Sequence, residues 1–370
     1  MAQENILVIA VDGLRASALG AYGNTTYPTP ALDQFAAQSL LADWCFVDAV
    51  ELPQIYRQLW GGEPSLLKSL ADRGYGLTLV TDDARVAELA EARAFNDCVK
   101  VAEAEPCRAE DIGDTALARV FAGAIEQVEA VQSELRLVWI HTQGMHGPWD
   151  APLDLQEELL NREEGDPPPA DDLAPPDSML SEKSDPDTAF RAACAYAAQS
   201  MTLDACVAGV CDAIDAVGRE NWIVVLCGLR GFPLGEHGRI GGVDGRLYAE
   251  QLHVPLVVRF ADGRLRLSRI GDLVSLADLP RMLLAADDGE LFVRGRESLV
   301  AGGTGGEGAI RTPGWSLVFG AKCDDSSDGV SDRYQLFVRP DDRWEANDVA
   351  ALCPDVVEEL LARLAASAGG

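Results

Sequence analysis

Several side chains able to bind a metal ion or transfer a proton follow apolar runs of this chain. Asp12 ends the first apolar run, His141 ends another, and His146 follows shortly after it. His237 lies in the turn Gly235–Gly238, and the fourth and last histidine, His253, precedes a strand-like run. Carboxylate oxygens and imidazole nitrogens can hold divalent cations, and histidine also works as a general acid or base.

Apolar runs rich in Val, Ile and Leu alternate with stretches of helical periodicity. The runs predict buried strands at Asn5–Val11, Gly76–Thr81, Leu135–His141, Trp222–Cys227 and Val254–Phe260. The helical stretches are Thr29–Leu40, Gly62–Asp72, Asp111–Val131 and Thr188–Val217. This alternation predicts a mostly parallel sheet covered by helices on both faces, with functional sites at the carboxyl ends of its strands. Asp12, Asp82, His141 and Gly228 lie at such ends.

The character of the sequence changes toward its C-terminus. Short strand-like runs at Trp315–Phe319 and Tyr334–Val338 precede an amphipathic helix, Pro354–Ala365. We therefore expect an α/β domain over residues 1–290 and a small α+β subdomain with an antiparallel sheet and a terminal helix over residues 291–370. Within the first domain, residues 163–187 are rich in proline and acidic residues, which predicts a flexible loop.

Composition limits the classes of partner. The net charge of −30 argues against nucleic acid and anionic membranes as partners. No apolar run reaches the ~18 residues of a membrane-spanning helix. The start of the chain carries no basic leader, and its nine cysteines include no Cys-x-x-Cys pair. These features predict a cytoplasmic protein in a reducing compartment, while the sequence gives no indication of oligomeric state.

Motifs spread over nearly the whole chain resemble those of the sulfatases of the alkaline-phosphatase superfamily. The N-terminal ones are Asn5–Arg15, which is similar to a strand ending in Asp-Asp-x-Arg, Thr29–Ala36, and His146-Gly147-Pro148-Trp149. Further along are Gly235–Gly238, Leu247–Glu250, Val254–Leu256, Ala309–Thr312, Tyr334–Phe337 and Glu345–Asp348. The resemblance implies the sulfatase fold, in which a mostly parallel central sheet lies between helical layers.

The resemblance also implies a demanding chemistry. Such enzymes hold a hard divalent cation, usually calcium, with carboxylate and amide oxygens. Their nucleophile is a formylglycine made from Cys or Ser, and Lys and His side chains neutralise the sulfate and protonate the leaving group.

This chain departs from that pattern at most of the matching positions. Asp12 keeps the first aspartate, but its neighbour is Gly13, as in phosphodiesterase relatives. The nucleophile motif falls on Glu51–Ile55, so Glu51 takes the nucleophile position and cannot become formylglycine. The second pair of metal ligands becomes Leu229 and Arg230.

At the other positions of the implied pocket, some family residues are lost and others are kept. The resemblance implies a lysine a few residues after the turn Gly235–Gly238, but Gly241 and Gly242 stand there. No lysine of this chain matches a site position. A shifted alignment would make Cys45 the nucleophile, but the Pro and Arg that formylglycine formation uses are missing there, and a buried strand cysteine is the alternative. His141, His146 and His237 fall on family site positions, which predicts that they face one pocket, together with Arg15.

The substitutions suggest a physical replacement for the metal. Burying Asp12 and Glu51 together without a cation would be costly, because like charges repel in a low-dielectric pocket. We predict that the guanidinium of Arg230 lies in or near the vacated metal position and pairs with Asp12, Glu51 or both. Leu229 would fill apolar volume. The alternative is an exposed, unpaired Arg230 beside a collapsed pocket.

These features support competing hypotheses about function. The first is a non-catalytic, sulfatase-like protein without a cofactor, which binds a sulfated or phosphorylated small molecule through His141, His146 and His237. The second is an active sulfuric or phosphoric ester hydrolase, in which Asp12, His237 and Glu51 hold Ca, Mn or Zn and water is the nucleophile. A third is a structural role in an oligomer.

Overall fold

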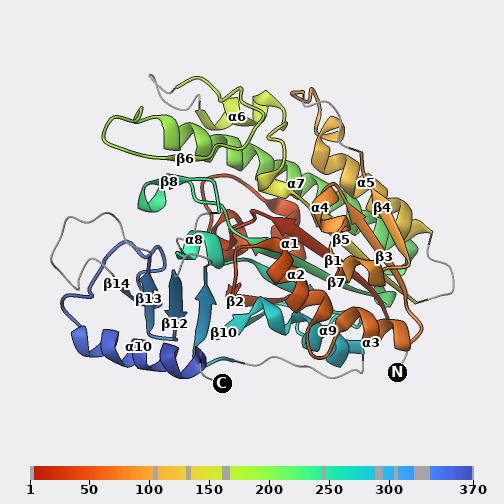
Figure 1. The fold of residues 1–370 in the computed structure, drawn as a ribbon. Helices are drawn as coiled ribbons and strands as arrows, with labels where there is room; N and C mark the ends of the chain where they lie inside the picture. The colour runs from red at the N-terminus through yellow and green to blue at the C-terminus, as the bar shows by residue number, and fades with distance from the viewer. Residues whose placement is uncertain are drawn as a thin grey trace.

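The structure is a computed structural model that describes residues 4–102, 107–130, 135–160, 167–243, 247–287, 295–303, 307–320 and 334–368. An eight-stranded sheet forms its centre, in the order β10-β2-β9-β7-β1-β5-β3-β4 (Figure 1). The strands are β1 (Asn5–Asp12), β2 (Leu40–Phe46), β3 (Gly76–Thr81), β4 (Asp97–Lys100), β5 (Arg136–Thr142), β7 (Trp222–Arg230), β9 (Leu256–Arg259) and β10 (Ser268–Ser275). All neighbours are parallel except β9, which is antiparallel to β2 and β7.

Helices cover both faces of this sheet, as the alternating pattern predicts (Figure 1). One face carries α1 (Pro30–Ala37), α5 (Ala116–Glu129) and α7 (Thr188–Gly218), with α6 (Leu153–Leu160) packed on α7. The other carries α2 (Leu52–Gly61), α3 (Leu66–Asp72) and α9 (Leu279–Asp287). Two short helices, α4 (Ala84–Ala87) and α8 (Ala249–Leu252), and a two-stranded sheet of β6 (Ser178–Met179) and β8 (Arg239–Ile240) lie in the connections.

A second, antiparallel sheet follows toward the C-terminus. Its strands are β11 (Leu299–Gly302), β12 (Gly308–Arg311), β13 (Trp315–Phe319) and β14 (Tyr334–Val338), in sequential order. The final helix, α10 (Pro354–Ala368), packs on this sheet through Val357 and Leu360. The predicted fold class is thereby confirmed. The proposed boundary between residues 290 and 291, and residues 163–166 of the predicted loop, lie outside the described residues.

Several predicted elements have different bounds: α3, for example, begins at Leu66 instead of Gly62, and β9 covers Leu256–Arg259 instead of Val254–Phe260. The helix expected over Thr29–Leu40 ends at Ala37, because Leu40 already begins β2. The helix expected from Asp111 begins at Ala116, since the Thr115 hydroxyl accepts a hydrogen bond from Ala118 N and caps the first turn. The strand expected over Trp222–Cys227 continues to Arg230.

The extension of β7 requires glycine at position 228. A Cβ there would lie 2.2 Å from the carbonyl oxygen of Leu14, so a larger residue would push the chain after β1 away. The close approach keeps the ends of β1 and β7 paired, with Asp12 opposite Arg230 beyond a register shift at Val11. Among the helices of the described ranges, none has the length and apolarity needed to cross a membrane.

Candidate functional site

A buried ion pair lies at the carboxyl ends of the two central strands. Arg230 donates from Nε to Asp12 Oδ1 at 2.7 Å and from Nη2 to Asp12 Oδ2 at 2.8 Å. Its Nη1 donates to the carbonyl oxygen of Val50 at 2.8 Å. Asp12 is 0% and Arg230 8% exposed. The guanidinium therefore links β1, β7 and the segment that leads into α2.

The charge of Arg230 sets the ionisation of Asp12. Burial alone would raise the pKa of this carboxyl, and the charge of Arg230 and its hydrogen bonds act against burial. The net result is that the pKa of Asp12 is lowered. Asp12 is thus a carboxylate with both oxygens engaged.

Glu51 lies beside this pair without joining it. It is the residue that precedes α2, and its carboxylate does not cap the helix. Its Oε2 is buried and has no hydrogen-bond partner among the described residues. Ile55, which the resemblance predicts at the position of the activating arginine, is 2% exposed and belongs to the core. Of the two carboxylates considered for Arg230, Asp12 alone is bound.

His141 and His146 both lie near Asp12. His141 is fully buried, with Nδ1 2.6 Å from the Tyr56 hydroxyl oxygen and Nε2 4.0 Å from Asp83 Oδ2. Burial lowers the pKa of His141 to about 4, so its ring is neutral at pH 7. His146 Nε2 is buried without a hydrogen-bond partner in the described part of the chain, and burial lowers its pKa as well.

His237 does not join the other two histidines. Its Nδ1 lies 2.8 Å from Glu250 Oε1, and its Nε2 lies 2.8 Å from the carbonyl oxygen of Glu345. The ring stacks on Tyr248 with 3.6 Å between centroids. Burial lowers the pKa of His237, but these acceptors, Glu250 above all, more than offset it and raise the pKa. Both nitrogens donate, so His237 connects the main sheet to the C-terminal segment.

Three other residues that the sequence singles out make contacts typical of residues that stabilise the fold. They are Arg15, Leu229 and Cys45. Arg15 donates to Glu236 Oε1 at 2.6 Å and to Ser17 Oγ at 2.6 Å. Leu229 is 0% exposed and belongs to the core on the face of the sheet that α2, α3 and α9 cover. Cys45 is buried in β2, and burial raises the pKa of its thiol well above the ordinary value. These surroundings give Cys45 the environment of a core residue and no activating base.

The donor set does not fit the divalent cation that the fold family implies. Both oxygens of Asp12 are bound by Arg230, and Leu229 offers no donor. Gly13 has a φ of 77°, and a Cβ there would lie 2.7 Å from Met145 Cβ, so a carboxylate at this position would be strained. The described ranges contain no group of three or more His, Cys, Asp or Glu side chains able to hold a metal ion.

Two residues that contact the site could not be predicted from the sequence. The Val50 carbonyl binds Arg230 through its backbone, and Tyr56 reaches His141 from the face of α2. Neither contact follows from residue type, because both depend on where α2 packs. Asp82 shows a further consequence of packing: burial raises its pKa to about 6, although Gln143 N and Thr142 donate to it.

Comparisons with known proteins identify the fold. A sequence model described as Sulfatase matches residues 4–287. Three solved structures cover almost all of both chains. A protein solved with its substrate D-glucosamine-2-N,6-O-disulfate has TM-score 0.74 and 15% identity, and covers 99% of this chain and 97% of its own. The phosphonate monoester hydrolase of Agrobacterium radiobacter has TM-score 0.72 and 13% identity, with 98% and 96% covered.

The third structure is BT1596, a 2-O GAG sulfatase, with TM-score 0.70 and 16% identity, which covers 99% of this chain and 92% of its own. No curated protein sequence matches the chain. At these identities the solved structures show the fold alone, which is the one that this chain shares with them.

Proposed function

The chain belongs to the sulfatase family, and from this premise we propose that it is a non-catalytic member with a binding or regulatory role. The observation that carries the proposal is the bidentate pair of Arg230 with Asp12. A cation fixed by the chain itself holds the carboxylate that would otherwise be a metal ligand. Arg230 brings charge, but it offers no open coordination position at which an ester oxygen could be polarised.

The nucleophile position supports the same proposal. Glu51 cannot supply formylglycine, and a buried Ile55 stands where an arginine would activate it. His141 and His146 remain near Asp12, both with lowered pKa values, and so are neutral at pH 7. Neutral imidazoles can donate hydrogen bonds to an anion but neutralise none of its charge.

A ligand class follows from the relatives by analogy. One neighbour was solved with a disulfated glucosamine, and another is described as a 2-O GAG sulfatase. We propose that this chain binds a sulfated or phosphorylated small molecule.

The test is a metal and activity measurement on the pure, full-length protein. We expect substoichiometric Ca, Mn and Zn by elemental analysis. We also expect no turnover of 4-nitrophenyl sulfate or 4-nitrophenyl phosphate, with each metal added in turn, above the rate of the Asp12→Asn variant. Asp172→Asn, which changes an exposed carboxylate of the same kind, is the matched control.

Turnover that Asp172→Asn retains and Asp12→Asn loses would overturn the proposal. That result would establish the alternative, a hydrolase with a reduced metal site. Equal background rates in all three proteins would support the non-catalytic assignment.

A further inference from the structure

Two cavities outside the Asp12 site meet at Arg15, Ser17 and Trp344. The larger has a volume of about 690 Å³ and the smaller about 280 Å³. All three shared residues line both of them. Asp12, Glu51 and Arg230 line neither. We call the two together the Trp344 groove.

The larger arm of the Trp344 groove is mainly apolar. It runs between α6, α7 and the segment after β1, and its lining includes Tyr27, Leu159, Phe190, Ala193, Leu234 and Trp344. Phe190 is 43% and Trp344 44% exposed. Large apolar side chains left this open around one concave surface are typical of a site for an apolar ligand body.

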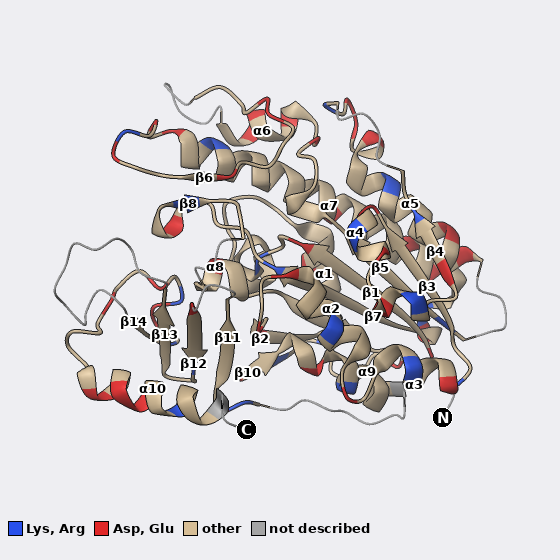
Figure 2. Cartoon of the chain, in the orientation of Figure 1, with Lys and Arg blue, Asp and Glu red and all other residues tan. Residues whose placement is uncertain are grey.

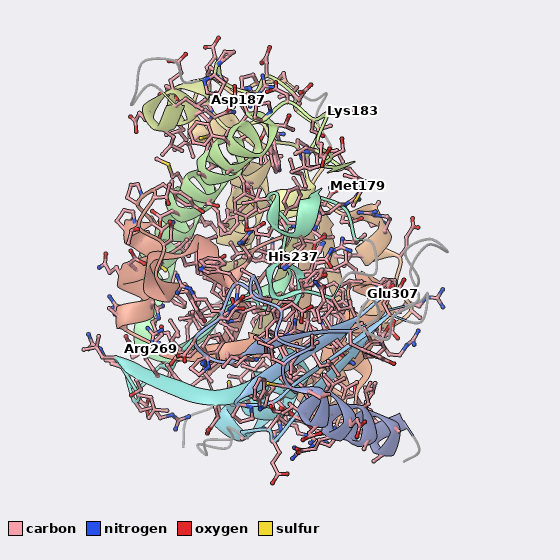
Figure 3. All side chains as sticks on the ribbon, turned by 90° about the vertical axis from the view of Figure 1, so that its left-hand side faces the viewer. Met179, Lys183, Asp187, His237, Arg269 and Glu307 are labelled. Carbon is pink, nitrogen blue, oxygen red and sulfur yellow. The ribbon has the colours of Figure 1, made fainter. Side chains whose placement is uncertain are left out.

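The smaller arm is charged, and nearly all of its charges are compensated. Arg269 donates to Asp43 Oδ1 at 2.8 Å, and the shared Arg15 pairs with Glu236 at 2.6 Å. Glu250, also in the lining, contacts His237. Figure 3 shows Arg269 at the exposed end of β10 and His237 nearer the centre of the same face.

Arg343 is the exception among these charges. Its Nη1 donates to the carbonyl oxygen of Tyr22 at 3.4 Å, and its guanidinium lies 4.7 Å from the centroid of the Trp344 ring. It is exposed and has no carboxylate partner among the described residues. The chain as a whole has a net charge of −30. An arginine without a carboxylate partner beside an apolar cavity therefore gives this place a positive charge, opposite in sign to that of the whole protein.

We propose that the Trp344 groove binds an amphipathic monoanion, with an aromatic or alkyl body in the larger arm and a carboxylate or sulfonate head at Arg343. The apolar lining supplies the favourable burial, and Arg343 supplies a charged hydrogen bond at the end of it. The inference goes beyond the proposed function, and it holds whether or not the Asp12 site performs any chemistry.

The experiment uses 8-anilinonaphthalene-1-sulfonate as the probe, an aromatic body with one sulfonate. Its fluorescence is titrated with the full-length protein at low ionic strength. Dodecanoate is then added as a competitor below its micelle concentration, with dodecanol as the neutral competitor of equal chain length. We expect one saturable site, displacement by dodecanoate, and clearly weaker displacement by dodecanol.

Variants separate the two arms. Arg343→Gln should weaken dodecanoate binding about three- to tenfold, as expected for a charged contact at a partly exposed site, and leave dodecanol unchanged. Its matched control is Arg363→Gln on α10, an exposed arginine that lines neither arm. Ala193→Trp should fill the larger arm and weaken both competitors more than tenfold, whereas Ala365→Trp on α10 should weaken neither.

Three results would overturn the proposal. The first is no saturable binding. The second is equal displacement by dodecanoate and dodecanol, which would show that the groove does not recognise an anionic head group. The third is binding unchanged in both Arg343→Gln and Ala193→Trp, which would place the probe elsewhere. Asp12→Asn should bind the probe like the wild type, so failure here and failure of the non-catalytic assignment are distinguishable.

Discussion

Arg230 and Asp12 form an ion pair in which neither charge has another ion-pair partner among the described residues. Asp12 has no contact with solvent, and the guanidinium takes both of its oxygens. Such a pair contributes little net stability, because bringing two charges out of water costs about as much as their attraction returns. Removal of one member is different, since the other stays buried and unpaired.

Arg230→Met should therefore lower the free energy of unfolding by about 3–5 kcal/mol at pH 8. Urea denaturation measures this loss. Arg191→Met is the control, because Arg191 pairs with Asp185 at 2.9 Å on the surface, where an ion pair contributes about 0–1 kcal/mol. The double variant Asp12→Asn/Arg230→Met should recover most of the loss, because no buried charge remains.

The pH dependence of Arg230→Met has a definite sign. In the wild type the pKa of Asp12 is lowered, so the stability from the pair is present above the unfolded pKa and is lost as pH falls through the folded one. In the variant, burial acts without Arg230 and raises the pKa of Asp12. The deficit relative to the wild type should shrink between pH 8 and pH 5. A constant deficit would show that lost packing dominates.

At the scale of elements, the sequence predicts the parallel strands and long helices well. β3 has the expected bounds and α7 matches within one residue, because a buried run and a long periodic stretch are local signals. Strand β2 and the helical start after Glu51 are not expected from periodicity. Their form depends on the sheet that β2 enters and the core that α2 covers.

In the candidate site, too, some features can be predicted from the sequence and others depend on how the elements pack. The resemblance to the sulfatases, which places Arg230 at a metal-ligand position, leads to an Arg230 pair with a carboxylate, because a buried cation and a buried carboxylate need each other. It does not decide between Asp12 and Glu51, which depends on the register of β7 against β1. His237 was expected with the other histidines. Its left-handed backbone, with φ 51°, belongs to the turn that carries it to Glu250 and Glu345.

The C-terminal sheet is joined to the main sheet through Glu345. Arg311 donates to Glu345 Oε1 at 2.8 Å, Ser316 Oγ donates to the same oxygen at 2.6 Å, and Ala249 N donates to Oε2 at 2.8 Å. Arg311 is 2% and Glu345 3% exposed. One carboxylate thus connects β12, β13 and α8.

Glu345→Gln should lower the free energy of unfolding by about 3 kcal/mol, because Arg311 then stays buried without a counter-charge. Gln keeps the size of the side chain, so the loss measures charge. Ser316→Ala is the comparison: it removes one hydrogen bond and should cost about 1 kcal/mol. Urea unfolding gives both values. A cost for Glu345→Gln no larger than that of Ser316→Ala would contradict the role assigned to the carboxylate.

The charge of the whole molecule is carried mainly by its surface. Acidic residues lie along α10 and on α6 and β4 (Figure 2), in keeping with the net charge of −30. Other titrating groups are buried or half-buried: His141 is 0% exposed, whereas His253, Asp48 and Asp82 are half-buried. Burial lowers the pKa of His141 to about 4 and that of His253 to about 3, and it raises the pKa values of Asp48 and Asp82 to about 6.

The two histidines and the two aspartates change the free energy of unfolding in opposite directions as the pH falls. The two histidines are neutral in the fold and take up protons in the unfolded chain near pH 6.5, so their stability contribution is lost from there downward. Asp48 and Asp82 bind protons in the fold first, so they favour the fold as pH falls below about 6. The net slope between pH 6 and pH 4 is a difference between these two effects.

Substitution of one histidine isolates its share of that slope. The ring of His253 lies between Trp44 and Phe46, and its Nε2 donates to the Asp43 carbonyl oxygen at 2.9 Å. His253→Gln keeps a donor but removes the titration. Stability should then fall less steeply between pH 6 and pH 4, by up to about 1.4 kcal/mol per pH unit.

His237→Gln is the matched control, because the pKa of His237 is raised instead of lowered. The stability that His237 contributes is fully present below the unfolded pKa and is lost only as pH rises through the folded one. Its removal should change the stability profile above pH 6.5 and leave the slope between pH 6 and pH 4 as in the wild type. If both variants made the fall in stability between pH 6 and pH 4 less steep by the same amount, loss of packing, and not the neutral ring of His253, would be the cause.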